Sequence, residues 1–201
     1  MKKKVAILGS TGSIGKSTLE VIKKDKKNFE ILLLTANNNY KLLIKQAKEF
    51  KVKNVLIKNT KFHLKVENSL KRNKVKVYSG NIPLNKIIKS KIDYTMSAIV
   101  GIAGLQPTID AIKISKIVAI ANKETIICAW EILKKIIKKY NTKILPIDSE
   151  HFSIMELTNN VSDDEVEEII ITASGGPFLN LPIQKLKKVK PKQAINHPKW
   201  S

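Results

Sequence analysis

The sequence has very few cysteine, arginine and aromatic residues. Aromatic residues make up 5% of its 201 positions, Arg72 is the only arginine, and Cys128 is the only cysteine. A single cysteine excludes an internal disulfide and fits a reducing compartment. No apolar run is long enough to span a membrane, and the stretch from Val5 to Leu8 is too short for a signal peptide. We therefore expect a cytoplasmic protein without a membrane partner.

The formal net charge of +20 is carried almost entirely by lysine. Such a charge usually indicates nucleic acid or another anionic partner. Base recognition and phosphate clamps favour the planar fork of arginine, however, and stacking on bases needs aromatic rings. We therefore interpret the lysines as solvated faces with a general attraction for phosphorylated ligands. Nucleic acid is therefore not an expected partner. The net charge is the only feature that supports the alternative of a nucleic-acid-associated protein.

Apolar strand patterns alternate with amphipathic helix patterns along most of the chain. With 43% hydrophobic and 27% charged residues, the composition is that of a globular protein that can bury one core and begin a second domain. The alternation predicts an α/β fold, a Rossmann-like doubly wound parallel sheet with helices on both faces. Strands are expected at 5–8, 29–36, 54–57, 75–78, 94–99, 117–121 and 143–147. Helices are expected at 17–24, 40–50, 64–70, near 87, at 105–114 and at 125–140.

The composition changes after Glu150. Residues 161–168 are acidic, a strand is expected at 169–173, and a short basic helix at 184–189. This change indicates that a second α/β domain begins near position 147.

A glycine-rich segment, Gly9–Gly15, joins the first expected strand to the first helix. Glycines allow a tight turn and a close approach to a pyrophosphate, while the N–H groups of the helix face the anion. The spacing is GxxGxxG, which also suits a turn without a ligand. Its position within a βαβ pattern favours nucleotide binding.

The second expected strand ends in Asn37, Asn38 and Asn39, with no acid to accept a ribose 2′-hydroxyl. This disfavours NAD and leaves room for the 2′-phosphate of NADP. The nearest positive charge in the sequence is Lys41. A polar turn without a ligand is the alternative.

Two carboxylates, Asp148 and Glu150, follow the last apolar strand. If the chain stays extended, they lie on one side, about 7 Å apart, and suit Mg²⁺ or Mn²⁺. The alternative is that Asp148 or Ser149 caps a helix that starts near His151.

Four further polar residues are candidates for a site. Lys123 could pair with a substrate phosphate or hydroxyl, and Glu124 could be a helix N-terminal acid. Ser174 precedes two glycines that could present N–H groups to a phosphate, and His197 could bind phosphate or be incidental. Cys128 has apolar neighbours and is expected to be buried, which argues against an aspartate-semialdehyde-type dehydrogenase with a reactive cysteine.

Six segments, in order and spacing, resemble the 1-deoxy-D-xylulose 5-phosphate reductoisomerase family, NADPH-dependent enzymes of non-mevalonate isoprenoid synthesis. They are GSTGSIG at 9–15, SAIVGIAGLQPT at 97–108, ANKE at 121–124, PIDSEH at 146–151, SGGPF at 174–178 and HPKWS at 197–201. The resemblance implies an NADPH domain at 1–146, the start of a catalytic domain at 147–201, and a homodimer at full length. About half of the family's length is covered, so a third carboxylate ligand and a helical bundle would lie beyond Ser201.

The resemblance also implies a role for each matching residue. NADPH contacts fall on Thr11, Gly12, Ser13, Ile14, Asn37, Asn38, Asn39, Asn122 and Glu124. Contacts to the sugar phosphate fall on Lys123, Ser149, Glu150, Ser174 and His197, and Trp200 begins a flap. The metal, Mn²⁺ or Mg²⁺ with Co²⁺ as a further option, falls on Asp148 and Glu150. Lys123, Asp148 and Glu150 are thereby implied as catalytic.

The implied reaction rearranges the carbon skeleton at a metal and then transfers hydride from NADPH. The family commonly has Gly-Lys-Asn where this chain has Asn37–Asn39, which leaves open how strongly NADPH is preferred. The alternative function is a truncated or decayed form that binds dinucleotide without catalysis.

Overall fold

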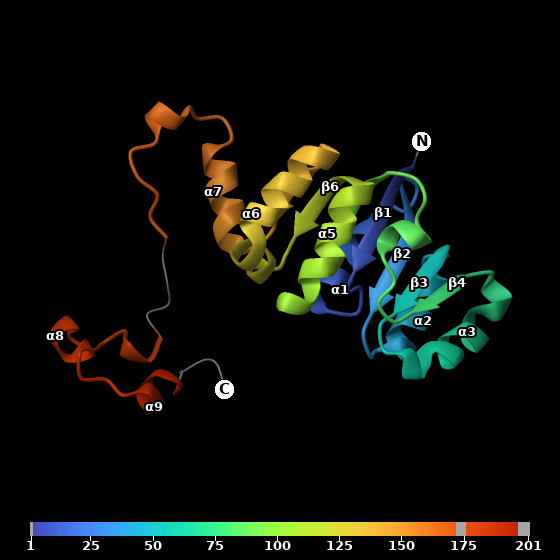
Figure 1. The fold of residues 1–201 in the computed structure, drawn as a ribbon, viewed down its shortest axis with the longest axis horizontal. Helices are drawn as coiled ribbons and strands as arrows, with labels where there is room; N and C mark the ends of the chain where they lie inside the picture. The colour runs from blue at the N-terminus through green and yellow to red at the C-terminus, as the bar shows by residue number, and fades with distance from the viewer. Residues whose placement is uncertain (1, 172–175, 197–201) are drawn as a thin grey trace. The chain divides into compact units, whose positions relative to one another are not determined.

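The computed structural model describes residues 2–171 and 176–196, and the chain divides into two compact units, Met1–Glu156 and Leu157–Ser201. The first unit contains a single seven-stranded sheet in the order β4-β3-β2-β1-β5-β6-β7, in which every neighbouring pair is parallel (Figure 1). The strands are β1 (Lys3–Leu8), β2 (Phe29–Ala36), β3 (Asn54–Ile57), β4 (Lys76–Ser79), β5 (Ile92–Ser97), β6 (Ser115–Ile120) and β7 (Lys143–Pro146).

Helices cover both faces of this sheet. The helices that begin in the first unit are α1 (Ser13–Lys24), α2 (Tyr40–Glu49), α3 (His63–Leu70), α4 (Leu84–Ile87), α5 (Leu105–Ile114), α6 (Lys123–Tyr140) and α7 (Ser149–Thr158). Apolar side chains of α1, α2 and α3 share one buried cluster with the sheet, and those of α4, α5 and α6 share the other. The predicted α/β fold with a doubly wound parallel sheet is confirmed.

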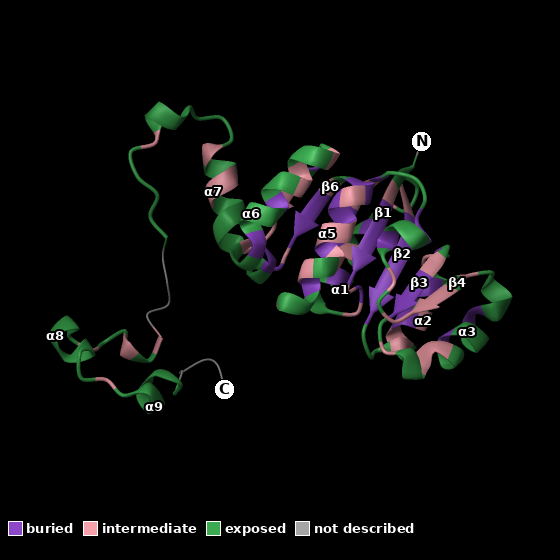
Figure 2. Ribbon diagram, in the orientation of Figure 1, coloured by how far each residue is buried: buried purple, intermediate pink, exposed green. Residues whose placement is uncertain are grey.

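The alternation of β1 shows how the sequence builds two cores. Val5 and Ile7 belong to the cluster of α1, whereas Ala6 and Leu8 belong to the cluster of α5 and α6. Successive side chains of a strand point to opposite faces, so a strand between two helical layers must be apolar at every position. Figure 2 shows the consequence, a sheet whose central strands are buried along most of their length.

The prediction that Cys128 is buried is wrong, because its side chain is exposed. The buried residues of α6 are Thr125, Ala129 and Leu133, which repeat every four positions on one face. Cys128 is not among them, and it lies beside Ala129, where the backbone of α6 departs from helical φ and ψ.

The second unit contains only short elements in its described residues. They are η4 (Asp163–Glu165), η5 (Gly176–Phe178), α8 (Ile183–Leu186) and α9 (Pro191–Ala194). The expected strand at 169–173 is wrong for the described residues 169–171, which are exposed and have no regular structure; residues 172–173 lie outside the described part. A strand needs a pairing partner, and propensity alone supplies none. Within the described residues, no helix has the length and apolar character needed to cross a membrane.

Candidate active site at the carboxyl edge of the sheet

The carboxyl ends of β1, β5, β6 and β7 meet around a hollow of about 350 Å³. Strand order reverses between β1 and β5, and ligands of doubly wound sheets bind outside the carboxyl ends at such a reversal. The residues that line this hollow are Ile14, Ala98, Ile99, Val100, Ala121, Asn122, Lys123, Glu124, Ile147, Asp148, Ser149 and Glu150. Four loops far apart in the sequence therefore supply one site.

The glycine-rich turn after β1 is shaped by backbone contacts. Gly9 has φ +81°, a left-handed conformation that side chains disfavour. A Cβ on Gly15 would lie 2.4 Å from the carbonyl oxygen of Gly9, so the turn can fold back on α1 only with glycine there. Helix α1 begins at Ser13, four residues earlier than expected, and no side chain caps its first turn. The predicted contacts Thr11, Gly12 and Ser13 all belong to this turn.

A buried polar network that the sequence interpretation missed holds the same turn. The Ser10 hydroxyl donates to Gln46 Oε1 at 2.8 Å, and Gln46 Nε2 donates to the Ser10 carbonyl at 2.9 Å. The Thr35 hydroxyl accepts from the Gly9 backbone N–H at 2.9 Å. Gln46 stands among the buried residues Leu43 and Ala47 of α2. A glutamine on an apolar helix face was the signal that could have revealed the network.

Asn122 is buried and uses both of its amide donors inside the protein. Its Nδ2 donates to the carbonyls of Ile99 at 2.6 Å and Gly101 at 2.7 Å, while its Oδ1 accepts from Thr125 N–H at 2.9 Å. The side chain thus caps α6 and fastens the loop after β5 to the loop after β6. It also brings the exposed Lys123 and Glu124 to the hollow.

The expected extended arrangement of Asp148 and Glu150 is wrong, because α7 begins at Ser149. Asp148 Oδ1 accepts from the backbone N–H of His151 at 3.1 Å and contacts His151 Nδ1 at 2.7 Å. Asp148 therefore caps the helix, which is the alternative that the sequence left open. Ser149 and Glu150 lie in the first helical turn and line the hollow.

The second carboxylate oxygen of Asp148 is buried and has no hydrogen-bond partner. Burial acts to raise the pKa of Asp148, but the hydrogen bonds and charge of His151 outweigh it and hold the pKa below its usual range. An ionised oxygen without a donor, in a hollow that Glu150 also lines, fits a divalent cation that prefers oxygen ligands. Within residues 2–171 and 176–196, no three or more His, Cys, Asp or Glu residues gather as a metal site. Further ligands of such an ion would come from outside these residues.

The asparagine run lies beyond the carboxyl end of β2, away from the residues that line this hollow. Asn39 Oδ1 accepts from Leu42 N–H and caps α2, and Asn38 Oδ1 accepts from Asn59 Nδ2. Asn37 contributes its carbonyl to Asn59 N–H. Ser174, His197 and Trp200, which the sequence also singled out, lie outside the described residues.

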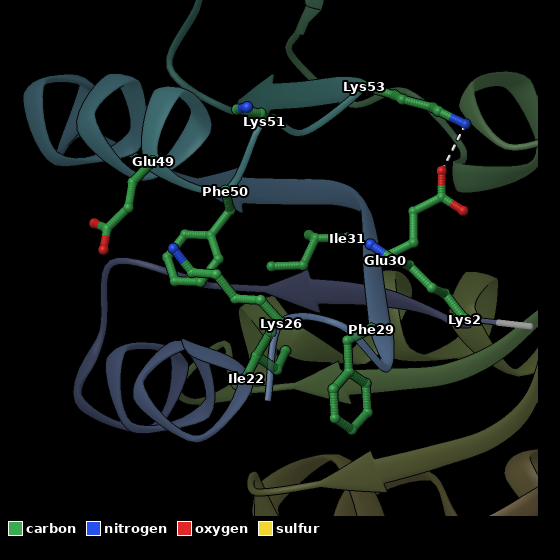
Figure 3. Close-up of a pocket in the computed structure, with 10 residues that line it drawn as sticks. All are labelled: Lys2, Ile22, Lys26, Phe29, Glu30, Ile31, Glu49, Phe50, Lys51 and Lys53. Carbon is green, nitrogen blue, oxygen red and sulfur yellow. Dashed lines mark ion pairs between the residues drawn. The ribbon is translucent and has the colours of Figure 1, made fainter. Parts of the chain in front are cut away.

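A second hollow, of about 410 Å³, lies at the opposite, amino edge of the sheet (Figure 3). It is lined by Lys2, Ile22, Lys26, Phe29, Glu30, Ile31, Glu49, Phe50, Lys51 and Lys53. Lys53 pairs with Glu30 at 2.6 Å, and the Lys26 ammonium lies 5.0 Å from the centre of the Phe50 ring. Although this hollow is the larger one, none of the predicted site residues line it.

Comparison with known sequences identifies the family of the chain. The profile of 1-deoxy-D-xylulose 5-phosphate reductoisomerase matches residues 5–130, and that of the reductoisomerase C-terminal domain matches 144–201. The reductoisomerase of Pelagibacter ubique is 54% identical over 99% of this chain, and that of Phocaeicola vulgatus is 44% identical over all of it. In each case the match covers 52% of the relative, so the chain spans about half the length of these relatives.

Solved structures give the same result. The reductoisomerase of Zymomonas mobilis in complex with NADPH matches 98% of this chain and 52% of its own, with a TM-score of 0.86 and 36% identity. A reductoisomerase in complex with NADPH, fosmidomycin and magnesium matches 99% of this chain and 52% of its own, with a TM-score of 0.79 and 32% identity. The profile match over most of the chain, together with these relatives, shows that the chain belongs to the 1-deoxy-D-xylulose 5-phosphate reductoisomerase family.

Proposed function

We propose that the chain forms the NADPH-binding domain (1–146) and the first part of the catalytic domain (147–201) of a working reductoisomerase. That enzyme, a homodimer at full length, would convert 1-deoxy-D-xylulose 5-phosphate to 2-C-methyl-D-erythritol 4-phosphate in non-mevalonate isoprenoid synthesis. The observation that carries the proposal is the buried, unpartnered oxygen of Asp148 in the hollow shared with Lys123 and Glu150. The complexes of similar proteins with NADPH and magnesium support it.

In this proposal the cofactor lies along the carboxyl edge of the sheet, from the asparagine run to the hollow. The Gly9–Gly15 turn receives the pyrophosphate, because its helix has no side-chain cap to occupy the first N–H groups. Asn122 acts mainly through its position, since both of its amide donors are engaged. The proposed NADPH contacts are Thr11, Gly12, Ser13, Ile14, Asn37, Asn38, Asn39, Asn122 and Glu124.

The sugar phosphate occupies the hollow beside these residues. Lys123 offers an exposed ammonium to the phosphate or a hydroxyl, and Ser149 offers a hydroxyl at the start of α7. Ser174 and His197 complete the proposed substrate contacts. Asp148 and Glu150 would hold Mg²⁺, Mn²⁺ or Co²⁺, and such an ion supplies charge stabilisation for oxyanions formed during the rearrangement. His151 orients Asp148 so that one oxygen remains available.

A second candidate function is dinucleotide binding without catalysis. It is favoured by the two-carboxylate metal site, which lacks a third protein ligand in the part of the chain that the structure describes. The glycine-rich turn and its Ser10–Gln46 support do not depend on that third ligand.

The test is an assay of NADPH binding and oxidation with 1-deoxy-D-xylulose 5-phosphate and Mn²⁺. The 201-residue chain is compared with the same chain fused to the remaining half of the Pelagibacter ubique relative. We expect the chain alone to bind NADPH without turnover and the fusion to turn over. Turnover by the chain alone would exclude the second candidate. A fusion that folds and binds NADPH but does not turn over would overturn the proposed catalysis.

A further inference from the structure

The carboxyl ends of β2 and β3 carry a set of contacts that the function proposed above does not explain. A dinucleotide in a sheet of this kind places its adenosine ribose beyond the end of the second strand. An acid there selects the 2′-hydroxyl of NAD, and a cation accommodates the 2′-phosphate of NADP. In this chain β2 is followed by three neutral asparagines, so neither charge comes from its own loop.

The loop after β3 runs directly beside this asparagine run. Pairing continues beyond the strands, since Lys58 N–H donates to the Ala36 carbonyl at 2.8 Å and Asn59 N–H donates to the Asn37 carbonyl at 3.2 Å. Asn59 Nδ2 then donates to Asn38 Oδ1 at 2.8 Å. The two loops therefore form one continuous surface.

The far ends of the two loops are also fastened together. Asn59 Oδ1 accepts from Lys61 N–H at 3.1 Å, which fixes the turn that carries Lys61. Phe62, the next residue, stacks on Tyr40 at the start of α2 with ring centroids 4.6 Å apart. This arrangement holds the backbone of Lys58 and Lys61 in place before any ligand arrives, which reduces the entropic cost of binding.

Lys58 and Lys61 are both exposed, and neither forms an ion pair with another described residue. Two other cations are near: Lys41 is exposed in the first turn of α2, and Lys65 is placed over the Tyr40 and Phe62 rings, at 5.6 and 5.9 Å from their centres. The only arginine, Arg72, lies past the far end of α3, an eight-residue helix about 12 Å long. Among the exposed lysines without an ion pair here, Lys58 and Lys61 are the two on the loop whose backbone is fastened to the asparagine run.

We propose that Lys58 and Lys61, from the loop after β3, select the 2′-phosphate of NADPH in place of a cation in the loop after β2. The asparagine run would shape the ribose pocket, with Asn38 and Asn39 held by Asn59 and by the first turn of α2. The lysines would supply the positive charge. This inference rests on the dinucleotide binding proposed above.

The experiment compares the affinities of the 201-residue chain for NADPH and NADH by fluorescence, with adenosine 2′,5′-bisphosphate and 5′-AMP as competitors. The test variant is Lys58→Gln/Lys61→Gln, and Lys71→Gln/Lys74→Gln is the matched control, with the same charge loss past the far end of α3. We expect the wild type and the control to prefer NADPH. The test variant should lose roughly tenfold or more in NADPH affinity, with NADH affinity unchanged and circular dichroism unaltered.

Several results would overturn the inference. An equal loss for NADPH and NADH would mean that the lysines only attract anions in general. An unchanged preference in the test variant, or a preference lost in Lys41→Gln instead, would assign the 2′-phosphate elsewhere. Binding of neither dinucleotide by the wild type would overturn the proposed function itself, and this inference with it.

Discussion

The two edges of the parallel sheet differ in the polar groups that line their hollows. At the amino edge, lysines and glutamates line the larger hollow, and Lys53 pairs with Glu30. At the carboxyl edge, the smaller hollow contains Asp148, which has one oxygen engaged and one buried without a partner. We therefore base the proposed site on the buried, unpartnered oxygen of Asp148 and not on the size of a hollow.

The largest effect is expected at the glycine-rich turn. A methyl group on Gly15 would meet the Gly9 carbonyl oxygen at 2.4 Å and the Ser10 Cα at 2.6 Å, and both are backbone atoms. Gly15→Ala should lower the free energy of unfolding by about 3 kcal/mol and abolish NADPH binding. Gly12→Ala is the control, because its Cβ would stand 3.4 Å from the nearest atom. Urea unfolding measures the stability of both variants, and equal losses of unfolding free energy would contradict the steric argument.

Asp148→Asn tests which edge holds the chemistry. The substitution removes the charge from the unpartnered oxygen while the size of the side chain is kept. Metal-dependent turnover of the fusion should fall by roughly a hundredfold or more. Glu30→Gln, which removes a carboxylate from the amino edge, should leave turnover unchanged. If both variants retained full activity, Asp148 would be a helix cap and nothing more.

Asn122→Ala measures how far the carboxyl edge depends on one buried side chain. Two carbonyls and the first turn of α6 would lose their partner, so the free energy of unfolding should fall by about 2–3 kcal/mol. Asn39→Ala removes a single, exposed cap from α2 and should cost about 1 kcal/mol. Similar losses in the two variants, measured by urea unfolding, would show that the bonds to Ile99 and Gly101 add little.

A substitution at the amino edge should change how the free energy of unfolding depends on pH, and not catalysis. Hydrogen bonds from the Lys116 side chain and the Lys4 backbone N–H hold the pKa of Asp93 below its usual range. A lowered pKa in the folded state stabilises the fold above the unfolded value, near 3.9, and that stabilisation is lost as pH falls through the folded value. The difference in unfolding free energy between wild type and Asp93→Asn should therefore shrink below about pH 4. A difference that stays constant down to pH 3 would exclude this linkage.

The smallest effect is expected for Cys128→Ser. The side chain is exposed on α6 and does not line the hollow, so stability and activity should be unchanged. In the folded wild type, the exposed thiol should react with a disulfide reagent about as fast as the thiol of the denatured protein does. A protected thiol would contradict the observed exposure, and a large loss of activity would reopen a role for the cysteine in catalysis.

The local sequence by itself determined most of the strands and helices of the first unit. β2, β3 and α5 have the predicted bounds, because their apolar spacing and flanking polar residues leave no other periodic solution. The glycine-rich turn was also predictable, since its glycines are a local property of the chain. These features depend on neighbours within a few residues.

Only the tertiary structure decided how distant residues combine. Ser10 meets Gln46, Asn122 joins two loops, and Lys58 comes beside the asparagine run because parallel strands bring separate loops to one edge. Packing against the core likewise buries Thr125, Ala129 and Leu133 of α6 and leaves Cys128 exposed. The spacing of apolar residues predicts each element, whereas the order of strands in the sheet decides which loops and side chains meet.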